Sequence, residues 1–178
     1  MGYMEITLQS STSLKLKGKH ASVFINPQDK TSGYNAAILI GNPAKSTLKI
    51  RDDVVIIDGP GEYEAGGIKI TGIKADSQTV YTLSIDNLDL VIGTKEALEK
   101  VHQKLKEQAI VVIQADTIEG DTSFISSLGM SARIFYGAKA HELADIFAKD
   151  TKKDSSKYVI TSEKLPLETE TVLLVSSN

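Results

Sequence analysis

The 178-residue sequence contains no cysteine, no tryptophan and only three histidines. The absence of cysteine excludes disulfides, thiolate zinc sites and cysteine nucleophiles, and it agrees with a reducing compartment. The histidines, His20, His102 and His141, lie far apart, and no two are spaced as H-x-H or H-x-x-x-H. Zinc held by clustered histidines is therefore not expected.

An excess of basic charge and a long apolar run are also missing. Twenty Lys and Arg residues against 23 Asp and Glu residues give a net charge of −3, whereas nucleic-acid binders usually carry a basic excess. No apolar run approaches the roughly 20 residues that span a bilayer, and the N-terminus has no hydrophobic signal core. We therefore expect a cytoplasmic protein that binds neither nucleic acid nor membrane. Met4 could be the natural start, which would make residues 1–3 non-native or disordered.

The first half of the chain is a series of short apolar segments. Each has four to seven residues that alternate or are β-branched, and Gly, Pro, Asn and Asp separate them, which is typical of strands and turns. Asp86 and Asn87 stand between two such segments and tolerate positive φ, which predicts a hairpin turn. The predicted strands cover residues 5–9, 13–17, 21–25, 36–40, 47–50, 54–58, 68–74, 79–85 and 88–92.

The second half alternates between strands and helices. The spacing of Leu98, Val101 and Leu105 predicts a helix over residues 95–108, with Thr94 as its N-cap. A strand-rich half followed by strand–helix alternation favours an α+β sandwich with helices outside, formed by a single domain over residues 1–178. A further helix is predicted over 138–150, strands over 109–114, 131–137, 157–161 and 170–175, and a solvated loop over 149–157.

The stretch DGPGEYEAGGIKITGI, residues 58–73, has five glycines and one proline in sixteen residues. Glycine at this density indicates a backbone that turns tightly or passes close to another group. A predicted strand follows, so the helix N-terminus of a phosphate-binding loop is missing. We expect a structural turn with at least one glycine at positive φ, formed by Gly59, Pro60, Gly61, Gly66 and Gly67.

Three regions carry a resemblance to a known family. Residues 58–73 are close to the phrase G-P-G-E-Y-E-V-x-G-V-x-I-x-G-I. Residues 4–27 have the spacing of an opening hairpin in which I-T-W-x-G-H-S-C-F leads to a strand ending in Asp-Pro, and residues 164–175 are similar to a closing segment. The chain thereby resembles the metallo-β-lactamase fold, most of all the small bacterial branch similar to L-ascorbate-6-phosphate lactonase. The resemblance implies an αββα four-layer sandwich and a metal-dependent hydrolase.

The metal ligands that this resemblance implies are absent. Asn26 stands where the family has Asp before Pro, and the loop 41–47, GNPAKST, has neither His nor acid where H-x-H-x-D-H is expected. The remaining ligands would fall on 74–78, on Thr94 and on 136–137, none of which contains His. No catalytic residue and no metal ligand is therefore assigned, and no cofactor is expected.

The segments that would carry the ligands should still meet at one edge of the sandwich. Strand-end loops on a rigid sheet are where binding sites are usually built. The segments offer one carboxylate, that of Asp76, as a ligand for a cation. The vacated pocket is expected to be lined by Asn42, Lys45, Ser46, Asp76, Thr94 and Tyr136.

Two other clusters are open to a functional interpretation. Lys15, Lys17 and Lys19 alternate along one predicted strand, which is typical of a solvent-facing side or a protected sheet edge, with a polyanion site as the weaker alternative. A group of carboxylates offers oxygen ligands for a hard cation. Turns and a solvent-facing strand explain this group better, and it comprises Asp52, Asp53, Asp58, Glu62 and Glu64.

The favoured hypothesis is a degenerate, metal-free member of the fold, a non-catalytic binding or assembly module that could form a homo-oligomer. Its partners are not identifiable from the sequence. The alternative is a metal-dependent hydrolase of a phosphorylated sugar, a lactone or a similar ester, with a weakly bound divalent metal at an atypical site. A small-molecule sensor that uses the vacated pocket is a third hypothesis.

Overall fold

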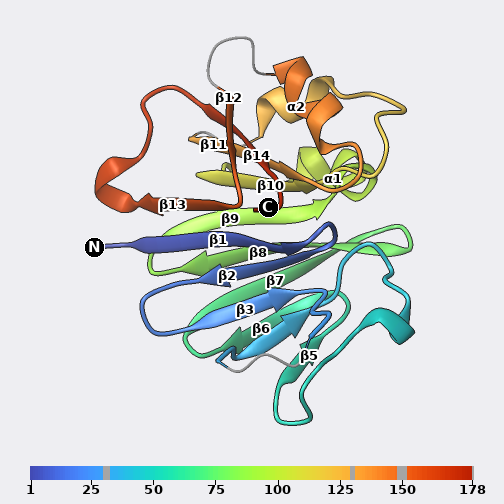
Figure 1. The fold of residues 1–178 in the computed structure, drawn as a ribbon, viewed down its shortest axis with the longest axis vertical. Coiled ribbons are helices and arrows are strands. Elements are labelled where there is room, and N and C mark those ends of the chain that lie inside the picture. The colour runs from blue at the N-terminus through green and yellow to red at the C-terminus, as the bar shows by residue number, and fades with distance from the viewer. Residues whose placement is uncertain (30–32, 129–130, 148–151, 178) are drawn as a thin grey trace.

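The computed structural model describes residues 1–29, 33–128, 131–147 and 152–177. Two mixed β-sheets pack face to face (Figure 1). Among the described residues, sheet A has six strands, in the spatial order β13 (Lys157–Thr161), β1 (Tyr3–Ser10), β2 (Ser13–Lys17), β3 (Ser22–Ile25), β4 (Ala36–Ile38) and β5 (Val55–Ile57). Sheet B has eight described strands, in the order β12 (Lys152–Ser155), β14 (Glu170–Leu174), β11 (Ala132–Tyr136), β10 (Ile110–Gln114), β9 (Leu88–Thr94), β8 (Gln78–Ile85), β7 (Ile68–Ala75) and β6 (Gly61–Ala65).

The central strands of sheet B, β9, β10 and β11, are buried on both faces, which explains their continuous apolar runs. Successive side chains of a strand point to opposite faces. Ile110 and Val112 of β10 accordingly pack between the two sheets. Val111 and Ile113, which alternate with them, pack on the other face of the sheet.

Helices cover the outer face of sheet B. Helix α1 (Lys95–Val101) packs Leu98 and Val101 there, and α2 (Ala140–Phe147) packs Leu143. Figure 1 shows α1 and α2 in the same half of the view as β10, β11 and β14. The described 3-10 turns are η1 (Lys45–Thr47), η2 (His102–Lys104), η3 (Ser123–Ser127) and η4 (Ser162–Lys164).

The outer face of sheet A has a thinner cover. Phe24 and Ala37 on this face cluster with Tyr34, Ile50 and Val54 from the intervening segments. Neither helix of the described residues lies on this side. The expected α+β sandwich is confirmed, with loops rather than a helix over sheet A.

Most predicted elements are present, and three differ from the prediction. Residues 48–50 form no strand, and α1 ends at Val101 and continues as η2. Lys152–Ser155, predicted as a solvated loop, form β12, which pairs in parallel with β14. Edge strand β12 is stabilised by backbone hydrogen bonds to its neighbour and does not need apolar side chains. Its polar sequence therefore lacks the apolar alternation that predicts a strand. The part of the predicted helix 138–150 beyond residue 147 lies outside the described residues.

The remaining local predictions concern turns and the first residues. Asp86 and Asn87 have φ values of 49° and 64°, which confirms the predicted hairpin turn. Tyr3 is the first residue of β1, and the Gly2 amide donates to Ser162 Oγ at 2.8 Å. None of the helices in the described ranges combines the length and apolar character needed to cross a membrane.

Candidate functional site

Three neighbouring parallel strands, β9, β10 and β11, end at the same edge of sheet B. Their register places Gln114 beside Thr94 on one side and beside Tyr136 on the other. Because residues in register point to the same face, all three side chains lie at the rim of the space between the sheets. The carboxyl ends of parallel strands are a common position for binding sites in α/β proteins.

A loop from sheet A reaches the same edge. Gly41 follows β4 at a φ of 69°, and a Cβ atom on it would lie 3.2 Å from Thr94 Cγ2 and 3.4 Å from Gln114 Nε2. The side chain of Asn26 holds this loop, since its Nδ2 donates to the Ile40 carbonyl at 2.9 Å and its Oδ1 accepts from the Ile40 amide at 3.0 Å. The two sheets are therefore in close contact at the strand ends.

The polar side chains at this edge bind one another. Tyr136 OH donates to Gln114 Oε1 at 3.3 Å, and Gln114 Nε2 donates to Asp116 Oδ2 at 2.7 Å. Thr94 Oγ1 donates to Gln78 Oε1 at 2.6 Å. We call these five residues the strand-end network. These hydrogen bonds engage Thr94 Oγ1, Tyr136 OH and both polar atoms of the Gln114 side chain.

Burial decides the chemistry of this network. Tyr136 is fully buried, and Thr94 and Gln114 are each 5% exposed, whereas Asp116 is exposed. Burial, and then the negative charge of Asp116, raises the pKa of Tyr136 well above its usual value. The phenol therefore stays protonated at neutral pH, as a hydrogen-bond donor rather than a base or a nucleophile.

The six residues expected to line a vacated pocket have different positions. Two of them belong to the strand-end network: Thr94 forms a hydrogen bond with Gln78, and Tyr136 forms one with Gln114. Asp76, in the β7–β8 turn, forms an ion pair with Lys100 at 3.6 Å on the side of helix α1. The other three, Asn42, Lys45 and Ser46, are exposed and outside the network.

Gln114 and Asp116 were not among the residues predicted to line the site. Both follow the buried apolar strand at residues 110–113, and β10 lies between the strands that end in Thr94 and Tyr136. The signal was available, because polar residues directly after a buried strand are candidates for a strand-end site.

The residues at this edge do not fit the metal that the fold family implies. Zinc is held by imidazole, thiolate and carboxylate groups, usually three or four of them. The network offers Asp116 as its one carboxylate, together with amides, a hydroxyl and a protonated phenol. Across the described residues, no three His, Asp or Glu side chains lie close enough together to hold a metal ion.

The other carboxylates are dispersed. Arg51 binds Asp53 through two hydrogen bonds of 2.9 and 2.5 Å. Glu62 and Glu64 alternate along the edge strand β6 and are exposed, as are Asp52 and Asp58. A turn and a solvent-facing strand account for this group.

The glycine-rich stretch closes one side of the sandwich. Gly59, Gly61, Gly66 and Gly67 have φ values of 134°, 146°, 60° and 83°, so the expected positive φ is present, but strand β6 divides the expected turn into a bend at Gly59 and Pro60 and a turn at Gly66 and Gly67. Around Pro60, the Gly59 amide donates to Tyr81 OH at 2.8 Å, and the Gly59 carbonyl accepts from Tyr63 OH at 2.9 Å.

Gly66 has a further role, because there the backbone passes close to sheet A. A Cβ atom on Gly66 would lie 2.7 Å from Asn35 Cγ and 3.0 Å from Ala21 Cβ. Gly66 therefore serves packing between the sheets, whereas a Cβ atom on Gly59 or Gly67 would meet nothing within 4 Å.

Comparison with known proteins supports the fold. No protein-family model matches the chain, and no curated protein is significantly similar to it in sequence. A structure from Thermotoga maritima assigned as a Zn-dependent hydrolase of the metallo-β-lactamase superfamily is similar, with a TM-score of 0.68 and 14% identity over 96% of this chain and 98% of that one. A structure from Parabacteroides distasonis assigned as a metal-dependent hydrolase has a TM-score of 0.58 and 13% identity, over 96% and 93% of the two chains.

A third similar structure is a variant of the β-hydroxylase CmlA, with a TM-score of 0.55 and 10% identity over 98% of this chain and 52% of that one. Two of these proteins are assigned as metal-dependent hydrolases and the third is a β-hydroxylase, and likeness at such low identity concerns the fold alone. None of them bears on the expected similarity to L-ascorbate-6-phosphate lactonase, which stays a prediction. From the two-sheet sandwich and these neighbours, we conclude that the chain has the metallo-β-lactamase fold.

Proposed function

We propose that the protein is a metal-free, non-catalytic member of this fold that acts as a binding or assembly module. The observation that carries the proposal is the strand-end network. Thr94, Gln114 and Tyr136 occupy the ends of three parallel strands and use their polar atoms on neighbouring side chains.

Chemical reasoning supports the absence of catalysis at this edge. Metal-assisted hydrolysis needs an ion with several protein ligands that lowers the pKa of a bound water to about 7. A protonated phenol, a hydroxyl and amides supply neither such a ligand set nor a general base. Asp116 alone could act as a base, and its Oδ2 accepts from Gln114.

Exposed apolar side chains at the sheet edges support the assembly part of the proposal. Val55 and Ile56 of edge strand β5 are 56% and 54% exposed, and Val159 of edge strand β13 is 44% exposed. An edge strand with apolar side chains favours pairing with another chain.

Metal analysis and activity assays test the proposal together. Protein purified without chelator should carry less than one zinc per chain and should melt at the same temperature with and without EDTA. Assays against phosphodiester, lactone and β-lactam substrates, with Zn²⁺ or Mn²⁺ added, should give no turnover above the control without protein. One tightly bound zinc per chain, or saturable turnover, would contradict the proposal.

A metal-dependent hydrolase with an atypical site is the second candidate. Two observations favour it: the similar structures are assigned as metal-dependent hydrolases, and Asp116 is exposed at the strand ends. If turnover with Mn²⁺ is found, Asp116→Asn or Asp76→Ala should abolish it. Asp89→Asn, at an exposed position of β9, is the matched control. Turnover that is lost in Asp116→Asn or Asp76→Ala and retained in Asp89→Asn would favour the hydrolase.

A further inference from the structure

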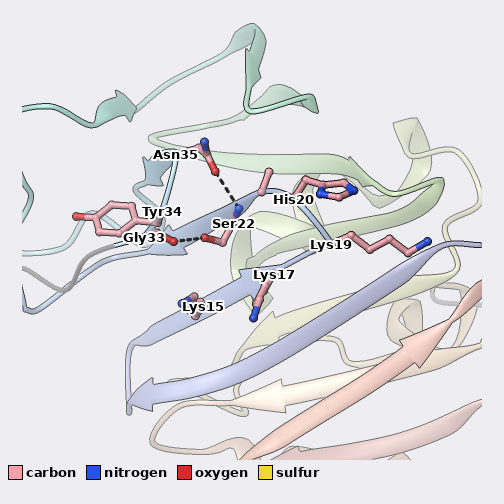
Figure 2. Close-up of a pocket in the computed structure, with 10 residues that line it drawn as sticks. Lys15, Lys17, Lys19, His20, Ser22, Gly33, Tyr34 and Asn35 are labelled. Carbon is pink, nitrogen blue, oxygen red and sulfur yellow. Dashed lines mark hydrogen bonds between the residues drawn. The ribbon is translucent and has the colours of Figure 1, made fainter.

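A hollow of about 420 Å³ opens on the outer side of sheet A, at the turn between β2 and β3 (Figure 2). Ten residues line it, of which four are basic and none is acidic. The basic residues are Lys15, Lys17, Lys19 and His20. We call this the lysine hollow, and it shares no residue with the strand-end network.

The strand geometry sets the spacing of the positive charges. Lys15 and Lys17 belong to β2 and point to the same face, because Leu14 and Leu16 between and beside them are buried in the core. Alternate residues of a strand are about 7 Å apart. Lys15 Nζ lies 5.7 Å from the centre of the Phe24 ring, which orients this ammonium group.

The three lysines form no ion pair with a carboxylate in the described part of the chain. Glu5 is opposite Lys17 in the register of β1 and β2. Its carboxylate accepts from Tyr3 OH at 3.0 Å and pairs with Lys157 at 3.1 Å. The Glu5 carboxylate is therefore already paired with Lys157 rather than with Lys17.

The turn itself has one further acid beside it. Asp86 accepts from the backbone amide of Lys19 at 2.7 Å, while Lys19 Nζ donates to the Met1 carbonyl. Asp86 thus holds the backbone of the turn, and it forms no ion pair with a lysine among the described residues.

The opposite wall of the hollow is held by hydrogen bonds. Ser22 Oγ donates to the Gly33 carbonyl at 2.6 Å, and the Ser22 amide donates to Asn35 Oδ1 at 3.0 Å (Figure 2). Ser22 is 4% exposed, so these bonds are protected from water. A wall fixed in this way lowers the ordering cost of binding.

We propose that the lysine hollow binds a small anion with at least two phosphate groups. Ammonium groups bind phosphate as point charges, and two lysines whose Cα atoms are about 7 Å apart on one strand can offer a charge to each of two phosphates. The whole chain has a net charge of −3, so this group of basic residues without an acidic neighbour in its lining differs from the overall charge balance. The proposal holds whether or not the protein is catalytic.

Isothermal titration with sodium tripolyphosphate tests this proposal. The wild-type protein should bind one equivalent, and binding should weaken between about 50 mM and about 200 mM salt, because the contacts are electrostatic. Lys15→Gln/Lys17→Gln should weaken binding at least about tenfold, which is about 1.4 kcal/mol, because two charged contacts to the anion are lost. The matched control, Lys74→Gln/Lys104→Gln, removes the same charge at exposed positions elsewhere and should bind like the wild type.

A second measurement locates the site. Tripolyphosphate should shift the NMR amide signals of Ser22, Gly33 and Asn35 and leave those of Thr94 and Gln114 unchanged. The single variant Lys17→Gln, at an exposed position, guards against loss of folding through the Lys15–Phe24 contact. The proposal is overturned by the absence of saturable binding, by equal loss in the control variant, by shifts at the strand ends instead, or by tighter binding of a single-stranded oligonucleotide.

Discussion

At the scale of single residues, the strand-end network joins four neutral side chains and one carboxylate, that of Asp116, through hydrogen bonds. A buried polar network stabilises a fold only when its members are satisfied, because an unpaired buried group costs about 1–3 kcal/mol. Gln114 is central, since it bonds both Tyr136 and Asp116. We therefore infer that these side chains stabilise the fold by hydrogen-bonding one another.

Removing the buried hydroxyl of Tyr136 tests this interpretation. Tyr136→Phe should lower the free energy of unfolding by about 1 kcal/mol, because Gln114 Oε1 then loses its donor. Urea denaturation measures the change. Tyr3→Phe, whose hydroxyl bonds a partly exposed carboxylate, should cost less. Equal stability of Tyr136→Phe and the wild type would show that the buried hydroxyl contributes nothing.

Gly66 and Gly67 form a matched pair for a second test. Both have positive φ, but a Cβ atom on Gly67 meets nothing within 4 Å, whereas on Gly66 it meets Asn35 at 2.7 Å. Gly67→Ala should lose about 1 kcal/mol from backbone strain alone. Gly66→Ala should lose more, because Asn35 must move and give up its bond to Ser22.

Asn35→Ala separates the two causes. In the Asn35→Ala background, the further loss caused by Gly66→Ala should fall toward that of Gly67→Ala. A thermal or urea denaturation series on the four variants measures this. If Gly66→Ala costs as much unfolding free energy in the Asn35→Ala background as in the wild type, the contact with Asn35 is not the cause of its loss of stability.

At the scale of elements, helix α1 begins directly after Thr94, which ends strand β9 and belongs to the strand-end network. Thr94 Oγ1 accepts from the Ala97 amide at 3.2 Å as the N-cap, and the Lys95 side chain is fully buried, with its Nζ donating to the Glu119 carbonyl at 2.5 Å. The end of β9, the start of α1 and the loop after β10 therefore form one connected unit.

Loss of the N-cap should weaken this unit. Thr94→Ala should cost about 1 kcal/mol of unfolding free energy, because the cap bond and the bond to Gln78 both disappear. Thr94→Ser keeps the oxygen and should retain most of the stability. Chemical denaturation followed by circular dichroism reports the difference, and equal effects of Ala and Ser would exclude the cap as the cause.

The edge strand β5 provides a test of assembly. If chains associate through this edge, light scattering should show an oligomer whose dissociation constant rises when Ile56→Lys is introduced, because a charge on an edge strand opposes pairing. Ile118→Lys, at an exposed apolar position outside the strands, is the control. A monomeric wild-type protein, or the same effect of both substitutions, would argue against association through β5.

At the scale of the whole molecule, the core between the sheets contains tyrosines whose ionisation opposes folding. Burial, and then the bond to Glu170, raises the pKa of Tyr158 well above its usual value, and burial also raises the pKa of Tyr81 and Tyr136. A group whose pKa is raised in the folded state contributes stability below its unfolded pKa, about 10 for tyrosine, and this stability is lost as pH rises through the folded value.

The molecule should therefore lose stability steeply above about pH 10. Thermal melts between about pH 8 and about pH 11 measure the effect. Tyr158→Phe should flatten the decline, although its stability at neutral pH falls through loss of the bond to Glu170. A melting temperature that is independent of alkaline pH would show that the tyrosines are accessible to water in the folded state.

Local patterns were enough to predict much of the fold. The strand at residues 13–17 and the turn at Asp86 and Asn87 depend on alternation and on backbone preferences of neighbouring residues. The absence of metal-ligand motifs is likewise a property of the sequence. Polar strand β12 was missed because its partner, β14, is needed to hold it.

By itself, the sequence determined most of the order of strands and helices, the positions of tight turns and the lack of clustered histidine and cysteine, because these depend on residues close together in the chain. Only the tertiary structure decided which polar residues meet. Gln114 joins Tyr136 across 22 positions, Asn26 holds Ile40, and Gly66 passes beside Asn35. Such contacts follow from sheet register and from the packing of one sheet on the other, which bring together residues that no local pattern relates.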